Sequence, residues 1–165
     1  MNRLIEWLPL NIPAGDETSI VHGDYRVDNL VFHPTEPRII AVLDWELSTL
    51  GHPLADISNH CMSWHVPPGA FRGIVGHDLA ALGIPSEREY VERYCRRVGR
   101  DAIDPNDWDF YLAYNMFRAA GILQGIAKRV VDGTAASQYA REVGKSARTL
   151  ADLGWKRVQM IMERR

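Results

Sequence analysis

The sequence HGDYRVDN, residues 22–29, decides the fold of this chain. It follows a short β-branched run, and a second apolar run, residues 39–43, ends in Asp44. Apolar runs of this length predict strands, and packing does not explain polar side chains placed directly after them. We therefore expect Asp24, Asn29 and Asp44 to meet at one polar site.

This pattern resembles the catalytic and metal-binding loops of kinase-fold phosphotransferases. Protein kinases carry H-R-D-x-x-x-x-N followed by D-F-G. The aminoglycoside/choline kinase-like enzymes carry H-G-D-x-x-x-x-N, then an apolar strand and a D-W or D-F pair. Residues 22–29 and the pair Asp44-Trp45 match the second pattern in order and spacing. The resemblance implies the C-terminal lobe of a protein-kinase-like fold, with ATP as phosphoryl donor and Mg²⁺ as cofactor.

The chemistry of phosphoryl transfer explains why these residue types occur together. The protein mainly has to position a hydroxyl group and neutralise charge. We interpret Asp24 as the base that accepts the hydroxyl proton, and Asn29 and Asp44 as oxygen ligands of Mg²⁺. Gly23 allows the loop to turn sharply. The structural alternative is that Asp24 and Asn29 are turn residues and that Asp44 caps a helix.

The resemblance also implies supporting roles for three further residues. His22 is expected to brace the loop through hydrogen bonds. Asp56, in the following helix, is expected to support the same loop rather than to touch substrate. Arg26 stands two residues after Asp24, where protein kinases carry a lysine that reaches the transferred phosphate. Phosphate binding and a solvent-facing side chain are both open interpretations of Arg26.

A closer likeness extends over most of the chain. Residues 22–56, with the segments 33–37 and 48–51, are similar to kinase-like domains fused to, or encoded near, acyl-CoA dehydrogenases, and residues 64–69 and 83–86 fit the same branch. This likeness implies a small-molecule hydroxyl acceptor, with a hydroxyacyl compound favoured over an aminoglycoside. Six residues are candidates for a pocket wall: Trp64, His65, Trp108, Tyr111, Tyr114 and Asn115. Aromatic residues at helical spacing are, however, more often part of the core.

The secondary-structure signals predict an α+β, mainly helical chain. We expect a single domain, 1–165, in which a small β-hairpin region carries the catalytic loops and a larger helical bundle follows. Ser86 and Glu89 form a capping-box signature. Gly121 and Gly125 lie one turn apart and predict close packing of another element there. The expected helices span 3–8, 53–64, 86–99, 104–133 and 135 to the C-terminus, and the strands span 19–21, 30–32 and a buried 38–43.

The composition excludes several other classes of protein. A net charge of −2 and a pI near 6.3 provide no basic field for nucleic acid. Residues 111–131 are rich in apolar side chains, but Arg118 and Lys128 interrupt them, which argues against a membrane span. Without an apolar leader the chain is expected to be cytoplasmic. Its two cysteines fit neither a disulfide framework nor a zinc site.

A complete kinase fold places a nucleotide-holding lobe ahead of the catalytic loop. Only 21 residues precede His22, and all three lysines, Lys128, Lys145 and Lys156, follow Asp44. We therefore expect a C-terminal lobe with the N-terminal lobe absent, which is incomplete as a catalyst and is prone to self-association. The alternative is a catalytically inactive, kinase-derived binding or assembly module.

Overall fold

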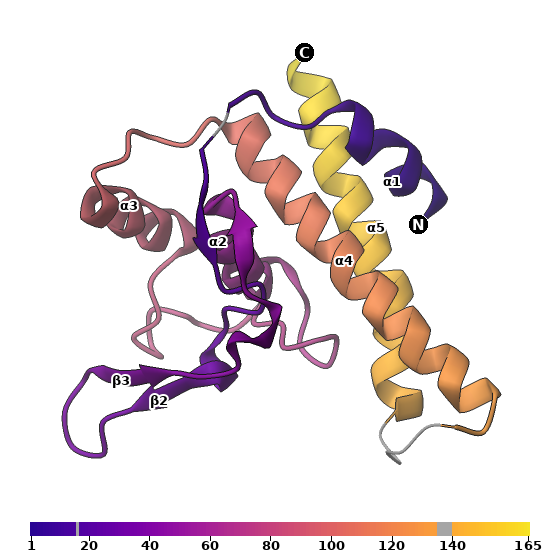
Figure 1. Ribbon diagram of the computed structural model, residues 1–165, viewed down its shortest axis with the longest axis horizontal. Coiled ribbons are helices and arrows are strands. Elements are labelled where there is room, and N and C mark those ends of the chain that lie inside the picture. Colours follow the sequence, from indigo (N-terminus) through magenta and orange to yellow (C-terminus); the bar gives the residue numbers. More distant parts are fainter. Residues whose placement is uncertain (16, 135–139) are drawn as a thin grey trace.

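Two long antiparallel helices form the scaffold of the protein. In the computed structural model, which describes residues 1–15, 17–134 and 140–165, α4 (Pro105–Val131) and α5 (Ala140–Arg164) lie side by side (Figure 1). The N-terminal helix α1 (Asn2–Trp7) continues as a 3₁₀ turn, Leu8–Leu10, and packs against α5. The predicted bundle is thus confirmed. The expected start of the last helix, 135–139, lies outside the described residues.

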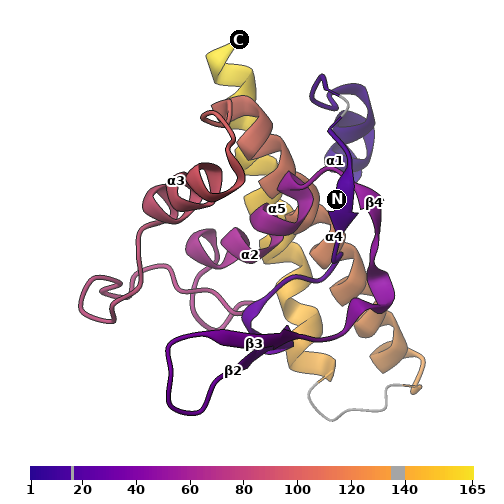
Figure 2. The same cartoon turned by 60° about the vertical axis from the view of Figure 1, so that its left-hand side comes forward.

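The strands form two small antiparallel pairs beside this scaffold. Strand β2 (Leu30–Phe32) pairs with β3 (Ile39–Val42), which confirms the predicted hairpin. Strand β1 (Ser19–Val21) pairs with β4 (Thr49–Gly51), a partner that the sequence did not indicate. Figure 2 shows the β2–β3 hairpin extending away from the helices, at the opposite end of the molecule from the C-terminus.

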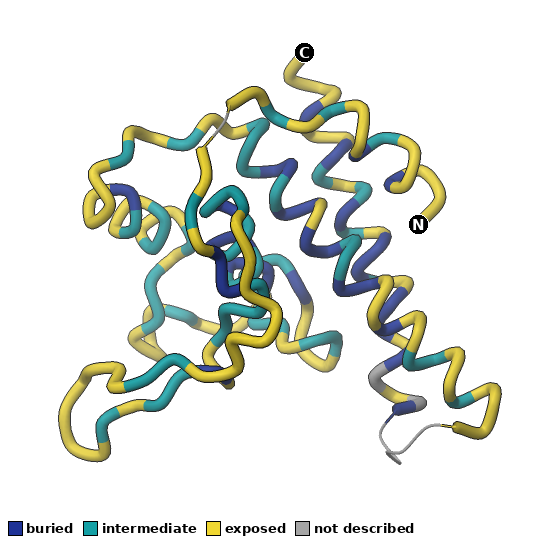
Figure 3. The backbone as a smooth tube through the Cα atoms, in the orientation of Figure 1, coloured by how far each residue is buried: buried dark blue, intermediate teal, exposed yellow. Residues whose placement is uncertain are grey.

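The strand predicted at 38–43 forms over Ile39–Val42, but the prediction that it is buried was wrong. Ile39 and Ile40 are 45% and 47% exposed, and Leu43 is 51% exposed. The two strands of the hairpin pack mainly against each other, so their apolar side chains lie at the surface of this chain. Figure 3 shows the exposed and half-buried hairpin, in contrast to the buried facing sides of α4 and α5.

Helices α2 (Leu54–Cys61) and α3 (Glu87–Val98) begin within one residue of their predicted starts at 53 and 86. Helix α2 is shorter than expected because it tightens into a 3₁₀ turn, Met62–His65. Helix α3 starts with the predicted capping box, in which the Glu89 amide donates to the Ser86 hydroxyl over 3.3 Å and the Ser86 amide donates to the Glu89 carboxylate over 2.9 Å. Such a box stabilises a helix by about 1 kcal/mol. The segment 66–85, which joins the 3₁₀ turn to α3, is irregular.

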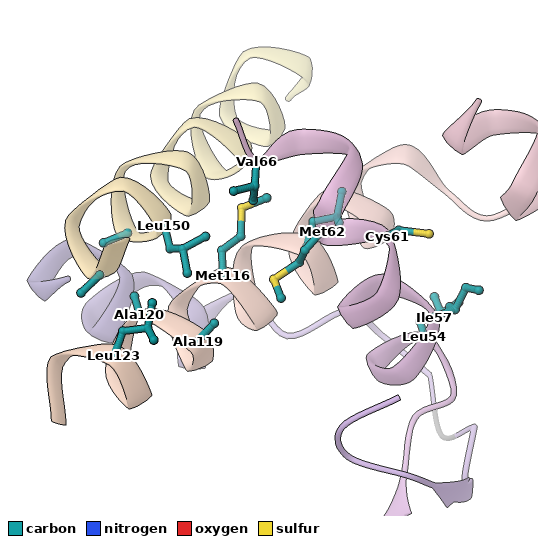
Figure 4. Packing of buried hydrophobic residues seen from close by; sticks show 13 residues of the cluster. Leu54, Ile57, Cys61, Met62, Val66, Met116, Ala119, Ala120, Leu123 and Leu150 are labelled. Carbon is teal, nitrogen blue, oxygen red and sulfur yellow. The ribbon is translucent and has the colours of Figure 1, made fainter. Parts of the chain in front are cut away.

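The main core lies where α2 meets α4 and α5. Leu54, Cys61, Met116 and Leu150 are fully or almost fully buried there, and Figure 4 shows Leu150 and Met116 where α5 meets α4, and Leu54 and Cys61 on α2. A second cluster, which includes Leu4, fixes α1 on the scaffold. The thiols of Cys61 and Cys95 are both free and buried. None of the described helices is long and apolar enough to cross a membrane.

The glycines of the long helices pack differently from what we predicted. A Cβ atom on Gly121 or Gly125 would meet nothing within 4 Å, because both residues face solvent. The close contacts are made by α5 instead. A Cβ on Gly144 would lie 2.9 Å from the Ala127 Cβ, and one on Gly154 would lie 3.3 Å from the Ala113 carbonyl oxygen. Helix spacing alone could not identify which glycines face the partner helix.

This difference predicts opposite effects of one substitution at two sites. Gly121→Ala should stabilise the protein by about 0.5–1 kcal/mol, because alanine restricts the unfolded chain and meets no neighbour. Gly144→Ala gains the same propensity but crowds Ala127, and overpacking costs about 1–3 kcal/mol. Urea unfolding should therefore show a higher midpoint for the first variant and a lower one for the second. Equal midpoints would contradict the assigned packing of α5.

Candidate active site

The loop of residues 22–29 is held by a carboxylate from the following helix. Asp56, in the first turn of α2, accepts hydrogen bonds from the His22 amide over 2.5 Å and from the Gly23 amide over 2.9 Å. A carboxylate that accepts two backbone donors makes strong, charge-assisted hydrogen bonds. Asp56 therefore fixes the direction in which the chain leaves β1 and enters the loop.

The imidazole of His22 braces the loop from inside. Its Nε2 lies 2.7 Å from the Leu43 carbonyl oxygen, and its Nδ1 accepts a hydrogen bond from the Asp24 amide over 3.2 Å. These two contacts require a proton on Nε2. His22 is 2% exposed, and its ring lies 4.7 Å, centroid to centroid, from the ring of Trp45. His22 thus connects the loop to the end of β3.

Gly23 could not be replaced by a residue with a side chain. Its φ of 82° is in the left-handed region, and a Cβ would lie 2.5 Å from the Leu47 carbonyl oxygen. The carbonyl of Gly23 accepts a hydrogen bond from the guanidinium of Arg118 on α4. The loop is therefore held on its amide side by Asp56 and on its carbonyl side by Arg118.

Asp24 and Asn29 lie in direct contact. The Asn29 Nδ2 donates to the Asp24 carbonyl over 2.9 Å and to the Asp24 carboxylate over 3.2 Å. With its amide nitrogen used in this way, Asn29 directs its Oδ1 away from Asp24. Asn29 is buried, so this side chain is fixed rather than solvated. The contact goes beyond what two independent turn residues would make.

Asp44 is brought beside Asn29 by the backbone. The Leu43 amide donates to the Asn29 carbonyl over 2.8 Å, so the residue that follows Leu43 begins next to the loop. Asp44 itself has a φ of 68° and precedes the 3₁₀ turn Trp45–Leu47. Its side chain makes no capping hydrogen bond within the described residues, so the alternative of a helix cap lacks its expected contact.

Arg26 forms an ion pair with Asp24. Its Nε lies 3.0 Å from the Asp24 carboxylate, and the two side chains are only 30% and 25% exposed. The positive charge of a guanidinium in this position balances the negative charge of the Asp24 carboxylate. Of the two interpretations of Arg26, a purely solvent-facing side chain does not fit this contact.

A pocket of about 480 Å³ opens at Asp24, a volume within the range of small-molecule sites. We call it the Asp24 pocket; it is lined by residues 24, 26–28, 59, 60, 62–64, 71, 72, 74 and 84. A larger hollow, of about 1200 Å³, lies against Asp56 and Tyr25 but does not include Asp24, and neither cavity is lined by Asn29 or Asp44. The smaller pocket is the relevant one for chemistry at Asp24.

The donor set fits a metal that takes few ligands from the protein. No group of three or more His, Cys, Asp or Glu side chains gathers in the described part of the chain. Mg²⁺ is usually held by one or two carboxylates together with substrate phosphates and water. One carboxylate and one amide oxygen, from Asp44 and Asn29, match that requirement.

Comparisons with known proteins show the family to which this chain belongs. Residues 1–114 match the Phosphotransferase enzyme family. A crystal structure of a "putative aminoglycoside phosphotransferase" from Ralstonia eutropha JMP134 superimposes with a TM-score of 0.90 and is 61% identical, covering 96% of this chain and 48% of the other. The chain belongs to this phosphotransferase family, and the kinase-like C-terminal lobe expected from the sequence is confirmed.

The similar sequences include much longer proteins. Mouse acyl-CoA dehydrogenase family member 10 is 46% identical over 157 residues, which cover 94% of this chain and 14% of the relative. Human acyl-CoA dehydrogenase family member 11 is 43% identical over 155 residues, which cover 93% and 20%. The predicted likeness to kinase-like domains associated with acyl-CoA dehydrogenases is confirmed, and this chain spans a seventh to a fifth of those relatives.

Sequence reasoning missed two supports on α4. Arg118 holds Gly23, and the buried amide of Asn115 donates to the Ala55 carbonyl over 2.9 Å and to the Ser58 hydroxyl over 2.8 Å. We had considered Asn115 as part of a pocket wall. The only signal for either residue was a polar side chain within the mainly apolar middle part of α4, residues 110–123. Of the six candidates for a pocket wall, Trp64 alone lines the Asp24 pocket.

The wall of the Asp24 pocket also carries a histidine whose titration is shifted. Burial lowers the pKa of His60 below its ordinary value of 6.5. The imidazole is surrounded by aromatic rings, with Tyr90 stacked at 5.1 Å, Trp64 at 5.8 Å and Tyr25 at 5.9 Å between centroids. His60 is therefore neutral at pH 7 and contributes to the pocket as a flat, uncharged ring.

This shift predicts a loss of stability on mild acidification. Below the ordinary pKa the unfolded chain takes up a proton at His60 that the folded chain resists, so the contribution of His60 to the free energy of unfolding falls between pH 7 and pH 5 and is constant above pH 7. His52, whose pKa burial also lowers, contributes in the same direction. In urea titrations at pH 7, 6 and 5, the free energy of unfolding of His60→Phe should decrease less between pH 7 and pH 5 than that of the wild type. The control His77→Phe, at an exposed position, should leave this decrease unchanged, and an unaltered slope in His60→Phe would contradict this account.

Proposed function

We propose that this chain is the catalytic lobe for ATP- and Mg²⁺-dependent transfer of a phosphoryl group to the hydroxyl of a small molecule, and that it is incomplete as a catalyst by itself. The observation that carries the proposal is the contact between Asp24 and Asn29, with Asp44 adjoining through the Leu43–Asn29 hydrogen bond. A base and two oxygen ligands are the parts that the C-terminal lobe supplies in this chemistry.

Each side chain then has one role. The acceptor oxygen attacks the γ-phosphorus, the bond from that phosphorus to the β–γ bridging oxygen breaks, and the hydroxyl proton passes to the carboxylate of Asp24. Asn29 Oδ1 and the Asp44 carboxylate would hold Mg²⁺, which neutralises charge on the phosphates. Arg26, already beside Asp24, would bind the transferred phosphate. His22 and Asp56 keep the loop in place and touch no substrate.

The Asp24 pocket supports an acceptor that is not a polycation. Its two acidic side chains, Asp24 and Asp28, are each paired with an arginine, Arg26 and Arg72, so it has no surplus negative charge. An aminoglycoside would need such a surplus. We propose a small hydroxyl compound as acceptor, and the acyl-CoA dehydrogenase names of the relatives favour a hydroxyacyl compound.

The roles of Asp24 and Asp44 can be separated by experiment in a protein that carries this lobe together with a nucleotide-binding lobe. Asp24→Asn should lower phosphoryl transfer by about 10²–10⁴-fold, because only the proton acceptor is lost. Its affinity for Mn²⁺, a paramagnetic substitute for Mg²⁺, should stay close to that of the wild type. Asp44→Ala should abolish metal binding and, with it, productive ATP binding.

Calorimetry with Mn²⁺ and a coupled assay for ADP release check these outcomes. Asp101→Asn is a suitable control, because Asp101 is exposed and does not line the Asp24 pocket. Near-normal turnover in Asp24→Asn would limit that residue to positioning. A wild-type protein that bound neither metal nor ATP would favour the inactive binding module instead.

We also propose that the 165-residue chain by itself binds ATP weakly and self-associates. Ile20 and Leu50 lie opposite each other on the β1–β4 pair and are 73% and 72% exposed, and Ile40 is exposed on the hairpin. Contiguous apolar surface of more than a few hundred Å² usually finds a partner.

Lysine substitutions should disrupt this association. Ile20→Lys and Ile40→Lys should each shift the sedimentation coefficient toward that of a monomer. Val131→Lys, at an exposed apolar position on α4 away from the strands, should have no such effect. A chain that sediments as a monomer at about 100 μM and binds Mg²⁺-ATP at micromolar concentration would contradict this proposal.

A further inference from the structure

The turn at residues 67–76 has an unusual backbone beside the Asp24 pocket. Phe71 has a φ of 35° and Arg72 a φ of 60°, and neither is glycine. Side chains rarely adopt this conformation, and it persists only where surrounding contacts impose it. Strain of this kind is concentrated at sites that hold ligands. The turn therefore calls for an explanation beyond chain connection.

Several contacts hold the turn in this conformation. The Ile74 amide donates to the Ser63 carbonyl over 2.9 Å, and the Val75 amide donates to the Val66 carbonyl over 3.2 Å. Phe71 packs against the main core. These interactions anchor the C-terminal part of the turn to the 3₁₀ segment Met62–His65 and to Val66 directly after it. As a result, the two strained residues are presented to the pocket in fixed positions.

Arg72 is connected to the catalytic loop at the rim of the pocket. Its guanidinium lies 2.8 Å from the carboxylate of Asp28, one residue before Asn29. The two side chains are 47% and 54% exposed, and an exposed ion pair contributes little to stability. The pair cannot account for the strained backbone. It does orient Arg72, and an incoming anion can replace Asp28 at small cost.

Phe71 and Arg72 both line the Asp24 pocket, which is not lined by Asn29 or Asp44. Met62, Trp64, Ile74 and Ile84 complete an apolar wall next to Phe71. Arg26, the other cation of the pocket, is already paired with the proposed base. Arg72 is therefore the cation that can change partner without disturbing Asp24.

We propose that Phe71 and Arg72 determine which acceptor the protein uses. Phe71 contacts the apolar part of the acceptor, and the Arg72 guanidinium binds an anionic group that the acceptor carries at some distance from its hydroxyl. This inference rests on the proposed function, since it assigns the acceptor side of the same site. It adds a requirement that the loop motif does not contain: the acceptor is an anionic alcohol with an apolar body.

The test uses two acceptor probes that differ in one charge, 6-hydroxyhexanoate and 1,6-hexanediol, in the lobe-complete protein. The wild type should have a lower KM for the carboxylate probe. Arg72→Gln should raise that KM about ten-fold, as expected for loss of one charge-assisted hydrogen bond at a partly exposed site, and should leave the KM for the diol unchanged. Phe71→Ala should raise KM for both probes.

The matched control is Arg38→Gln, which removes an exposed arginine that pairs with Glu36 in the hairpin, outside the pocket. It should alter neither KM. If Arg72→Gln leaves the ratio of the two KM values unchanged, the assignment of Arg72 is overturned. If Phe71→Ala leaves both KM values unchanged, the assignment of Phe71 is overturned.

A second measurement does not depend on turnover. The indole N–H of Trp64, which lines the pocket and donates to the Pro85 carbonyl, gives an NMR resonance that Trp64→Phe identifies. Hexanoate should shift this resonance in the wild type and in Asp24→Asn, and the shift should be lost in Arg72→Gln. An equal response to hexanoate and hexanol would overturn the inference. A hexanoate response in a protein that does not hydrolyse ATP would overturn only the proposed function.

Discussion

The site depends on the two hydrogen bonds that Asp56 accepts from the amides of His22 and Gly23. These donors lie at the point where β1 ends and no strand partner can satisfy them. A buried backbone donor without a partner costs about 1–3 kcal/mol. The carboxylate avoids that cost and fixes the plane of the loop at the same time. The direction of Asp24 is therefore decided by Asp56, a residue that does not line the Asp24 pocket.

Helix α4 in turn determines where Asp56 lies. Asn115 holds the first turns of α2 through Ala55 and Ser58, and Arg118, three residues later on the same helical face, holds Gly23. One helix thus positions both the support and the loop that it supports. Because α4 is packed along α5, the geometry of the site is tied to the main core rather than to the small strands.

The sequence predicted local features well and distant partners poorly. The capping box at Ser86, the hairpin and the order of the polar residues in the loop follow from short-range chemistry, and each could be read from a few neighbouring residues. The roles of those loop residues stay predictions. The pairing of β1 with β4 joins segments too short to carry an alternating pattern. Arg118 reaches a loop 95 residues earlier in the chain, and no local rule encodes such a contact.

The apolar β2–β3 hairpin illustrates a different limit of prediction from sequence. Ile39 and Ile40 have the composition of a buried strand, yet they are exposed in this chain. A run of apolar residues indicates that a strand can pack against another element, but it does not indicate which element that is. The same ambiguity affected Gly121 and Gly125, whose spacing suits a helix crossing on a face that points to solvent.

The two buried cysteines have a practical consequence for work with this protein. Burial raises the pKa of the thiols of Cys61 and Cys95 above the ordinary range, so almost no thiolate is present at neutral pH while the chain is folded. Alkylating reagents attack the thiolate. Cys61 lies in the main core and Cys95 on α3 at its margin, so the rates at which the two are labelled report how often separate parts of the fold open. The chain carries two internal reporters of local opening without any added label.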